Sequence, residues 1–246
     1  MPAIARSEPF RQQACPLAVC DGSGWILGPE DVARPCQCRA ERLRRGRSRG
    51  IASAIPARYR GVSFDRPPVS DMVRDLKTKI AVNEVHTYID ELDDRLSKGR
   101  GLWLFGDTGT GKTTLAMLIS KAALEAGRSV AIYSLPKLLA RIRRTYDSEP
   151  NGESYLSFFE RLTSVDLLHL DDVGAEKRSD WVLEQLYALV NERYEDQRSI
   201  LITTNLPHPE LEEQIGSRTV SRLTEMCDEV EVLGKDHRYG KVSEAA

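Results

Sequence analysis

The sequence contains 246 residues, of which 41% are apolar and 29% are charged, and its net charge is −2 at neutral pH. This balance is typical of a globular protein and argues against a generally basic surface for nucleic acid or anionic membranes. No run reaches the roughly 18 apolar residues of a membrane span, and residues 1–14 lack the apolar core of a signal peptide. We therefore expect a cytoplasmic protein without membrane contact.

Four of the five cysteines lie close together near the N-terminus. In a reducing compartment, such a cluster is more often a metal site than a set of disulfides. The first pair has a spacing that is usual for zinc, whereas the second pair is tighter than usual. A structural zinc ion would supply most of the folding free energy of so short a segment. We predict that Cys15, Cys20, Cys36 and Cys38 bind Zn²⁺. A redox pair and unpaired thiols are the alternatives.

A basic connector follows the cysteines. Between Arg39 and Arg60, eight arginines accompany the single acidic residue Glu41. We place a domain boundary after residue 50, so that residues 1–50 form a zinc module with its connector and residues 51–246 form a second domain. At the start of the second domain, apolar residues recur at helical spacing from Met72 to Leu96, which predicts one long amphipathic helix capped by Ser70.

Beyond this helix, short apolar runs alternate with helical patterns. The alternation predicts an α/β fold with a mostly parallel sheet that is covered by helices on both faces. The last cysteine, Cys227, is expected to be a packed thiol. The predicted strands are residues 102–105, 130–133, 165–170, 200–203 and 230–233.

A glycine-rich loop, GDTGTGKTT, follows the first of these strands and fits the pattern G-x-x-x-x-G-K-[ST]. Its glycines allow backbone N–H groups to surround a β-phosphate, and the helix that begins near Lys112 directs its positive end toward the same point. Lys112 would reach the β- and γ-phosphates, and Thr113 would be a ligand of Mg²⁺. The predicted ATP-binding residues are Gly106, Asp107, Thr108, Gly109, Thr110, Gly111, Lys112, Thr113 and Thr114.

Two further strands end in polar residues. The run VDLLHLDD places Asp171 where it would hold Mg²⁺ beside Thr113, and Asp172 would face the attacking water. The run ILITTN brings Asn205 to the same edge, where its amide would orient that water and sense the γ-phosphate. His169, inside the first of these strands, is expected to be a packed core residue.

These motifs, together with IPARYRGVSFD, SLPKLLARIRRTY and SRTVSRL, resemble the AAA+ ATPases and, among them, the DnaC/DnaI group of replicative helicase loaders. The resemblance covers about residues 55–240. It implies a P-loop ATPase core with strand order 5-1-4-3-2 and ATP held between neighbouring subunits, hence self-association. It also implies that Asn205 is the first sensor, Arg222 the arginine finger, with Arg218 as the second choice, and Arg238 the second sensor.

Asp172 departs from the glutamate of most AAA+ enzymes, and its shorter side chain suits a slow, partner-regulated switch better than a motor. In SLPKLLARIRRTY, Ser134 would cap a helix that buries its leucines and presents a basic stripe. The resemblance implies that this stripe contacts single-stranded DNA, whereas a solvated helix face is the simpler interpretation. The three residues of the basic stripe are Lys137, Arg141 and Arg144.

The function favoured by the sequence is an ATP-hydrolysing loader that delivers a hexameric replicative helicase onto single-stranded DNA, with the N-terminal module gripping the helicase. An IstB-like ATPase that assists a transposase is the closest alternative. A small-molecule phosphotransferase is less favoured, because no lid or acceptor pocket is evident. A pure adaptor that binds ATP without hydrolysing it is the remaining possibility.

Overall fold

The computed structural model describes residues 15, 17, 19, 20, 25–27, 33–38, 55–146 and 154–236. The chain divides into two compact units, residues 1–50 and 51–246. In the first unit, strands β1 (Trp25–Leu27) and β2 (Ala33–Pro35) form an antiparallel hairpin. Among its described residues, Cys15, Cys36 and Cys38 are buried, and Cys20 and Ile26 pack against them.

A five-stranded sheet forms the centre of the second unit. Its strands lie in the order β4-β5-β6-β3-β7, and every pairing is parallel. Counted along the chain from β3, this is the order 5-1-4-3-2, so the predicted fold class is confirmed. The strands are β3 (Gly101–Phe105), β4 (Val130–Ser134), β5 (Leu167–Asp171), β6 (Ser199–Thr204) and β7 (Cys227–Glu231).

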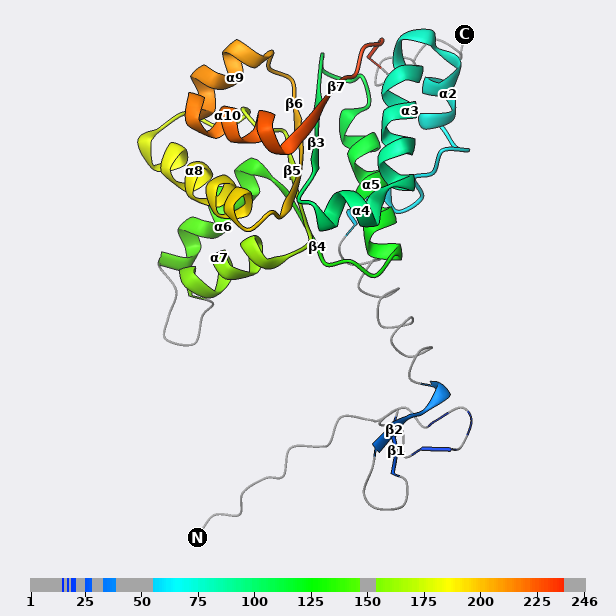
Figure 1. Cartoon of the computed structure of the whole chain (residues 1–246). Helices are drawn as coiled ribbons and strands as arrows, with labels where there is room; N and C mark the ends of the chain where they lie inside the picture. The colour runs from blue at the N-terminus through cyan, green and yellow to red at the C-terminus, as the bar shows by residue number, and fades with distance from the viewer. Residues whose placement is uncertain are drawn as a thin grey trace, which may run out of the picture. The chain divides into compact units, whose positions relative to one another are not determined.

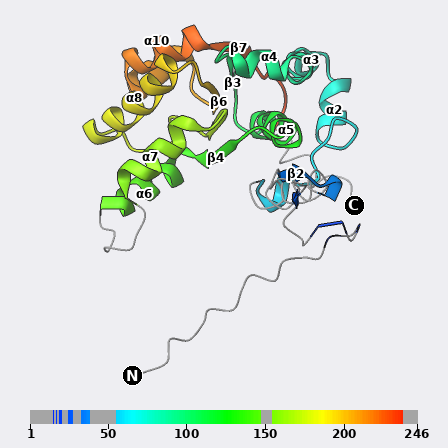
Figure 2. The same cartoon turned by 60° about the horizontal axis from the view of Figure 1, so that its bottom comes forward.

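Helices cover both faces of the sheet (Figure 1), and the same two layers are seen after rotation (Figure 2). Because side chains alternate along a strand, Leu102 and Leu104 of β3 join the core on one face, whereas Trp103 joins the core on the other. The first face carries the 3₁₀ turn η2 (Ala57–Tyr59) and helices α2 (Val69–Arg74), α3 (Leu76–Asp90), α4 (Leu92–Ser97) and α5 (Lys112–Glu125). The second face carries α6 (Leu135–Tyr146), α7 (Tyr155–Ser164), α8 (Asp180–Glu195), α9 (His208–Ile215) and α10 (Ser217–Met226).

The single long helix predicted for residues 72–96 is wrong, because the chain forms α2, α3 and α4 there instead. Asp75 is extended, with ψ 119°, and its side chain accepts a hydrogen bond from the N–H of Lys77, so it caps α3. Ser70 lies inside α2 rather than at its cap. Leu76 and Ile80, which the prediction placed on the buried stripe, are 81% and 66% exposed.

Strand boundaries also differ from the prediction, and β5 begins at Leu167 rather than at residue 165. The last strand is residues 227–231 rather than 230–233, because Cys227 and Val230 are the buried positions that pair with β3. Ser134 is the final residue of β4 and immediately precedes α6, so the helix begins where the prediction placed it. The buried stripe of α6 is confirmed, and it consists of Leu135, Leu138, Leu139 and Ile142.

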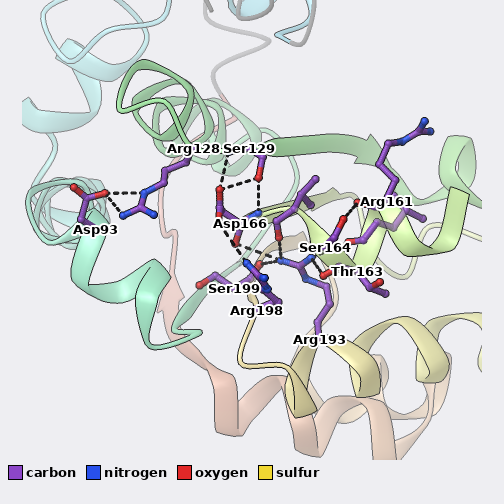
Figure 3. A network of polar contacts seen from close by, with 12 residues as sticks. Asp93, Arg128, Ser129, Arg161, Thr163, Ser164, Asp166, Arg193, Arg198 and Ser199 are labelled. Carbon is purple, nitrogen blue, oxygen red and sulfur yellow. Dashed lines mark hydrogen bonds and ion pairs between the residues drawn. The ribbon is translucent and has the colours of Figure 1, made fainter. Parts of the chain in front are cut away.

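Arg193 of α8 ties together the amino ends of two strands (Figure 3). Its side chain is fully buried. Its guanidinium donates to the carbonyls of Leu162 and Thr163 at 2.8 and 3.0 Å, and to those of Val165 and Ser199 at 2.9 and 2.7 Å. Burial lowers the pKa of Arg193 to about 9, so the side chain remains protonated at neutral pH. One side chain therefore satisfies carbonyls from the end of α7, the approach to β5 and the start of β6.

We expect Arg193→Met to lower the free energy of unfolding by about 3 kcal/mol or more, because several buried carbonyls lose their donors at once. Urea denaturation at neutral pH measures this change. Arg198→Met is the matched control, because the Arg198 side chain is 41% exposed and lies 3.5 Å from Asp166, and it should cost no more than about 1 kcal/mol. Equal stabilities of the two variants would contradict the role given to Arg193.

Candidate functional site

The loop between β3 and α5 has the conformation that a phosphate-binding loop requires. Gly111 is the N-cap of α5 in the left-handed region, with φ 102°, and a Cβ there would lie 2.9 Å from the Met72 side chain. Gly109 has φ 83°, and a Cβ there would lie 2.0 Å from the Asp236 carboxylate. The positive φ at both positions favours glycine, and a side chain at either one would also require the Met72 or Asp236 side chain to move.

Lys112 begins α5 and lies under this loop. It is only 5% exposed. Its Nζ donates to the carbonyls of Gly106 and Asp107 at 2.8 and 2.6 Å, and Thr110 Oγ1 donates to the Asp107 carbonyl at 2.9 Å. The predicted ATP-binding residues 106–114 thus form one closed loop and the first turn of one helix. A helix N-terminus with a lysine inside such a loop fits a phosphate group.

The acidic residues lie at the carboxyl end of β5. Asp171 is the last residue of the strand, and Thr203 Oγ1 of β6 donates to its Oδ1 at 2.7 Å. Asp172 follows in the left-handed region, with φ 55°, and its N–H donates to the same Thr203 hydroxyl at 3.0 Å. Asn205 comes directly after β6 and is exposed. Because β5, β6 and β3 are neighbours, the predicted Asp171, Asp172, Asn205 and phosphate loop all meet at one edge of the sheet.

Oxygen donors are the ligands that Mg²⁺ prefers. The Asp171 carboxylate and the Thr113 hydroxyl provide them, and the hydrogen bond from Thr203 holds the carboxylate in place. These residues therefore fit the cation that accompanies a nucleotide. They would hold it, and it would neutralise phosphate charge when bound.

His169 lies behind the acidic pair. It is fully buried, as predicted, and burial lowers its pKa to about 3, so the imidazole is neutral. Its Nδ1 lies 2.8 Å from Ser120 Oγ of α5. Its Nε2 has no hydrogen-bond partner among the described residues and lies 4.0 Å from Asp171 Oδ1.

The chain that leaves β7 passes over the phosphate loop. The N–H of Val232 donates to the Phe105 carbonyl at 2.7 Å, and Asp236 lies against Gly109. Arg238, the predicted second sensor, lies outside the described residues. The last described residue before it, Asp236, lies at the phosphate loop.

The two candidate finger residues lie on α10 in different surroundings. Arg222 Nε donates to Asn191 Oδ1 at 2.7 Å, and its guanidinium lies between the rings of Tyr187 and Tyr194, at 5.2 and 5.3 Å from their centroids. Arg218, one turn earlier, is exposed. Arg222 is thus engaged within its own chain, whereas Arg218 extends from the surface.

The predicted basic stripe on α6 is uneven. Lys137 and Arg144 are exposed. Arg141 is half-buried, donates to the Tyr133 hydroxyl at 3.3 Å, and lies 4.9 Å from the centroid of the Phe158 ring. Two of the three cations therefore lie at the surface, and the third also packs against the protein.

The four N-terminal cysteines converge. Their sulfurs all lie within 4.8 Å of one another, with Cys15 and Cys36 at 3.9 Å and Cys20 and Cys38 at 3.5 Å. None forms a disulfide. Four thiolates bound at a Zn–S distance of about 2.3 Å would be about 3.8 Å apart, so the cluster fits tetrahedral zinc. Backbone N–H groups of Cys20 and Val19 lower the pKa of Cys15 to about 6, which favours a thiolate there. Cys227 is separate from the cluster and buried, as predicted.

Comparison with known proteins identifies the family. The model of the IstB-like ATP-binding proteins matches residues 89–245, which is more than half of the chain. The chain belongs to the IstB-like ATP-binding family. It is 27% identical to the uncharacterized protein YdaV of Escherichia coli K12 over 172 residues, covering 70% of the chain and 65% of YdaV. It is 26% identical to the replicative helicase loader DnaC of the same strain over 144 residues, covering 58% of the chain and 56% of DnaC. The matched segments thus span less than two thirds of either relative.

Solved structures of three replication proteins have a similar fold. The DnaC helicase loader structure has a TM-score of 0.62 at 24% identity, covering 72% of this chain and all of that one. The DnaI structure has a TM-score of 0.58 at 19% identity, covering 74% of this chain and 93% of that one. The DnaA initiator bound to AMPPCP and single-stranded DNA has a TM-score of 0.58 at 20% identity, covering 70% of this chain and 52% of that one.

Among the described residues, no helix is long and apolar enough to cross a membrane.

Three contacts at the site were not predicted from the sequence. They are the bond from Thr203 to Asp171, the pair of Ser120 with His169, and the approach of Asp236 to Gly109. The first joins the ends of two neighbouring strands, whose polar ends were already expected to meet at one edge. Nothing in the sequence indicated the other two, because they join segments that are far apart in the chain.

We expect the purified chain to contain about one zinc ion and Cys36→Ser to lose most of it, because three thiolates close a tetrahedral site poorly. Metal analysis after gel filtration measures the content. Cys227→Ala is the matched control, because it removes a buried cysteine outside the cluster and should leave zinc unchanged. Wild-type protein without zinc, or unchanged zinc in Cys36→Ser, would contradict the assignment.

Proposed function

We propose that this protein is an ATP-hydrolysing loader that delivers a hexameric replicative helicase onto single-stranded DNA. The observation that carries the proposal is the meeting of the phosphate loop, Asp171, Asp172 and Asn205 at one sheet edge in a chain of the IstB-like ATP-binding family. Similarity to a relative named as a replicative helicase loader supports the choice of partner. Assistance to a transposase is the alternative, because the family takes its name from IstB-like proteins.

In the proposed reaction, Lys112 binds the β- and γ-phosphates and Thr113 with Asp171 holds Mg²⁺. Asp172 accepts a proton from the attacking water, and Asn205 orients that water. Arg222 or the more exposed Arg218 would reach the γ-phosphate of a neighbouring copy. Because an aspartate is shorter than the usual glutamate, we expect turnover to be slow and to depend on the partner.

We also propose that the N-terminal module, residues 1–50, is the part that grips the helicase, and that zinc holds it in shape. Among the described residues of this module, the buried cluster consists of cysteines with Ile26 packed against them. Its fold would therefore depend on the metal, and its surface would be available for a partner.

Helicase capture tests the main proposal. Immobilised protein should retain the replicative helicase of the same organism in the presence of ATP and release it as ATP is hydrolysed. Asp172→Asn should bind ATP, release at least about 100-fold less phosphate, and keep the helicase bound, because general-base catalysis contributes about 10² to 10⁴. If the wild-type protein does not retain the helicase either with ATP or without it, the loader assignment is refuted. Retention of a transposase instead would favour the alternative.

Alanine variants of the two candidate finger residues are tested with the same phosphate-release measurement. Arg218→Ala and Arg222→Ala should each be tested for phosphate release and for urea denaturation, because Arg222 packs between Tyr187 and Tyr194. The arginine finger is the residue whose replacement by alanine abolishes phosphate release without changing the free energy of unfolding. If both variants release phosphate at the wild-type rate, neither residue is the finger.

We further propose that Lys137, Arg141 and Arg144 contact the phosphates of single-stranded DNA. Replacing all three by alanine should weaken binding and reduce the slope of log K against log salt by about 2, since each phosphate contact on a single strand contributes about 0.7. Fluorescence anisotropy over a salt series measures this slope. Arg143→Ala is the matched control, because Arg143 lies on the same helix, α6, but its guanidinium lies 4.6 Å from the centroid of the Trp181 ring of α8. An unchanged slope in the triple variant would contradict the proposal.

A further inference from the structure

His169 occupies an unusual place for a core residue. It lies in β5 two residues before Asp171, so strand alternation directs both side chains to the same face. Its Nδ1 is held 2.8 Å from Ser120 Oγ. Its Nε2 is buried without a hydrogen-bond partner among the residues described, and the Asp171 carboxylate lies 4.0 Å away. A buried polar atom in this state is costly, so its presence calls for a reason.

The neighbours of the ring decide where its proton lies. A neutral imidazole carries one proton, on either Nδ1 or Nε2. The Ser120 hydroxyl can donate to Nδ1, which leaves the proton on Nε2. The opposite tautomer would direct a lone pair at the Asp171 carboxylate, which is repulsive. His169 therefore presents the N–H of Nε2 to the Asp171 carboxylate, 4.0 Å away.

The oxygen of Asp171 that faces His169 already accepts a hydrogen bond from another residue. Thr203 Oγ1 donates to Asp171 Oδ1 at 2.7 Å, and the His169 Nε2–H faces that same oxygen. At 4.0 Å the histidine contact is longer than a hydrogen bond, so it acts electrostatically. Both groups favour one orientation of the carboxylate, with Oδ1 directed into the protein. Oδ2 is then the oxygen left for a ligand.

We propose that His169, fixed by Ser120, is a positioning residue that orients Asp171 so that its Oδ2 faces the divalent cation of a bound nucleotide. This inference rests on the proposed ATP site. The groups that hydrogen-bond or face a ligating carboxylate typically change metal affinity 10- to 100-fold when they are removed. Because His169 is beyond hydrogen-bond distance, we expect its effect to be at the low end of this range.

Manganese binding tests this role without reference to turnover. The full chain is saturated with a non-hydrolysable ATP analogue, and the free Mn²⁺ is followed by electron paramagnetic resonance. His169→Leu should raise the Mn²⁺ dissociation constant about tenfold, while the affinity for the analogue without metal stays unchanged. His169→Gln should restore most of the affinity, because its amide can place an N–H donor near the position of Nε2. Ser120→Ala should give an intermediate value, because the ring loses the contact that fixes its tautomer.

The outcomes are distinguishable. Wild-type Mn²⁺ affinity in a folded His169→Leu protein would overturn the inference and leave His169 as a packing residue only. If His169→Leu does not fold, Ser120→Ala decides the question, and an unchanged Mn²⁺ affinity there would overturn the inference. If the wild-type protein binds neither the analogue nor Mn²⁺ with it, the proposed ATP site itself fails, which is a separate result.

Discussion

The parallel pairing of β5, β6 and β3 is the constraint on which the rest of the molecule depends. Parallel strands end at the same edge, so the loops that follow these three strands must meet there. The pairing also sets individual contacts, because Leu170 lies opposite Ile202 and the next residues, Asp171 and Thr203, then come within hydrogen-bond reach. A change of register would separate the acidic residues from the hydroxyl that holds them.

The polar residues at the amino ends of these strands differ in role from those at the carboxyl ends. At the amino ends, Arg193 satisfies carbonyls of the segments that enter β5 and begin β6, and Figure 3 shows this network. At the carboxyl ends, polar groups are left available for a ligand. Most of the buried polar side chains belong to one of these two regions, since Lys112, Thr110, Ser120 and His169 surround the site and Arg193, Thr163 and Ser199 surround the network.

Some features near the carboxyl end of β5 carry a cost that packing alone does not explain. Asp172 adopts a positive φ, which most residues avoid. Glu176, in the loop after it, has its pKa raised by burial, and one of its carboxylate oxygens has no partner among the described residues. These groups and His169 Nε2 lie on and just after β5, whereas Gln197 also has a positive φ, and Trp103 Nε1, Arg193 Nε and Ser199 Oγ are also buried without a hydrogen-bond partner among the described residues. Strain and unsatisfied polar groups commonly concentrate where a protein binds a ligand.

The sequence alone predicted the α/β fold class and the candidate site residues that the structure brings to one edge of the sheet. A strand, a glycine-rich loop and a lysine are contiguous, so local pattern predicted the phosphate loop, and the five apolar runs predicted the parallel sheet. Long-range contacts decided the rest. The break at Asp75 depends on a cap and on which residues the sheet buries, so helical spacing from Met72 to Leu96 could not reveal it. The pairing of Ser120 with His169, and the engagement of Arg222 by Tyr187, Tyr194 and Asn191, join segments that only the tertiary structure brings together.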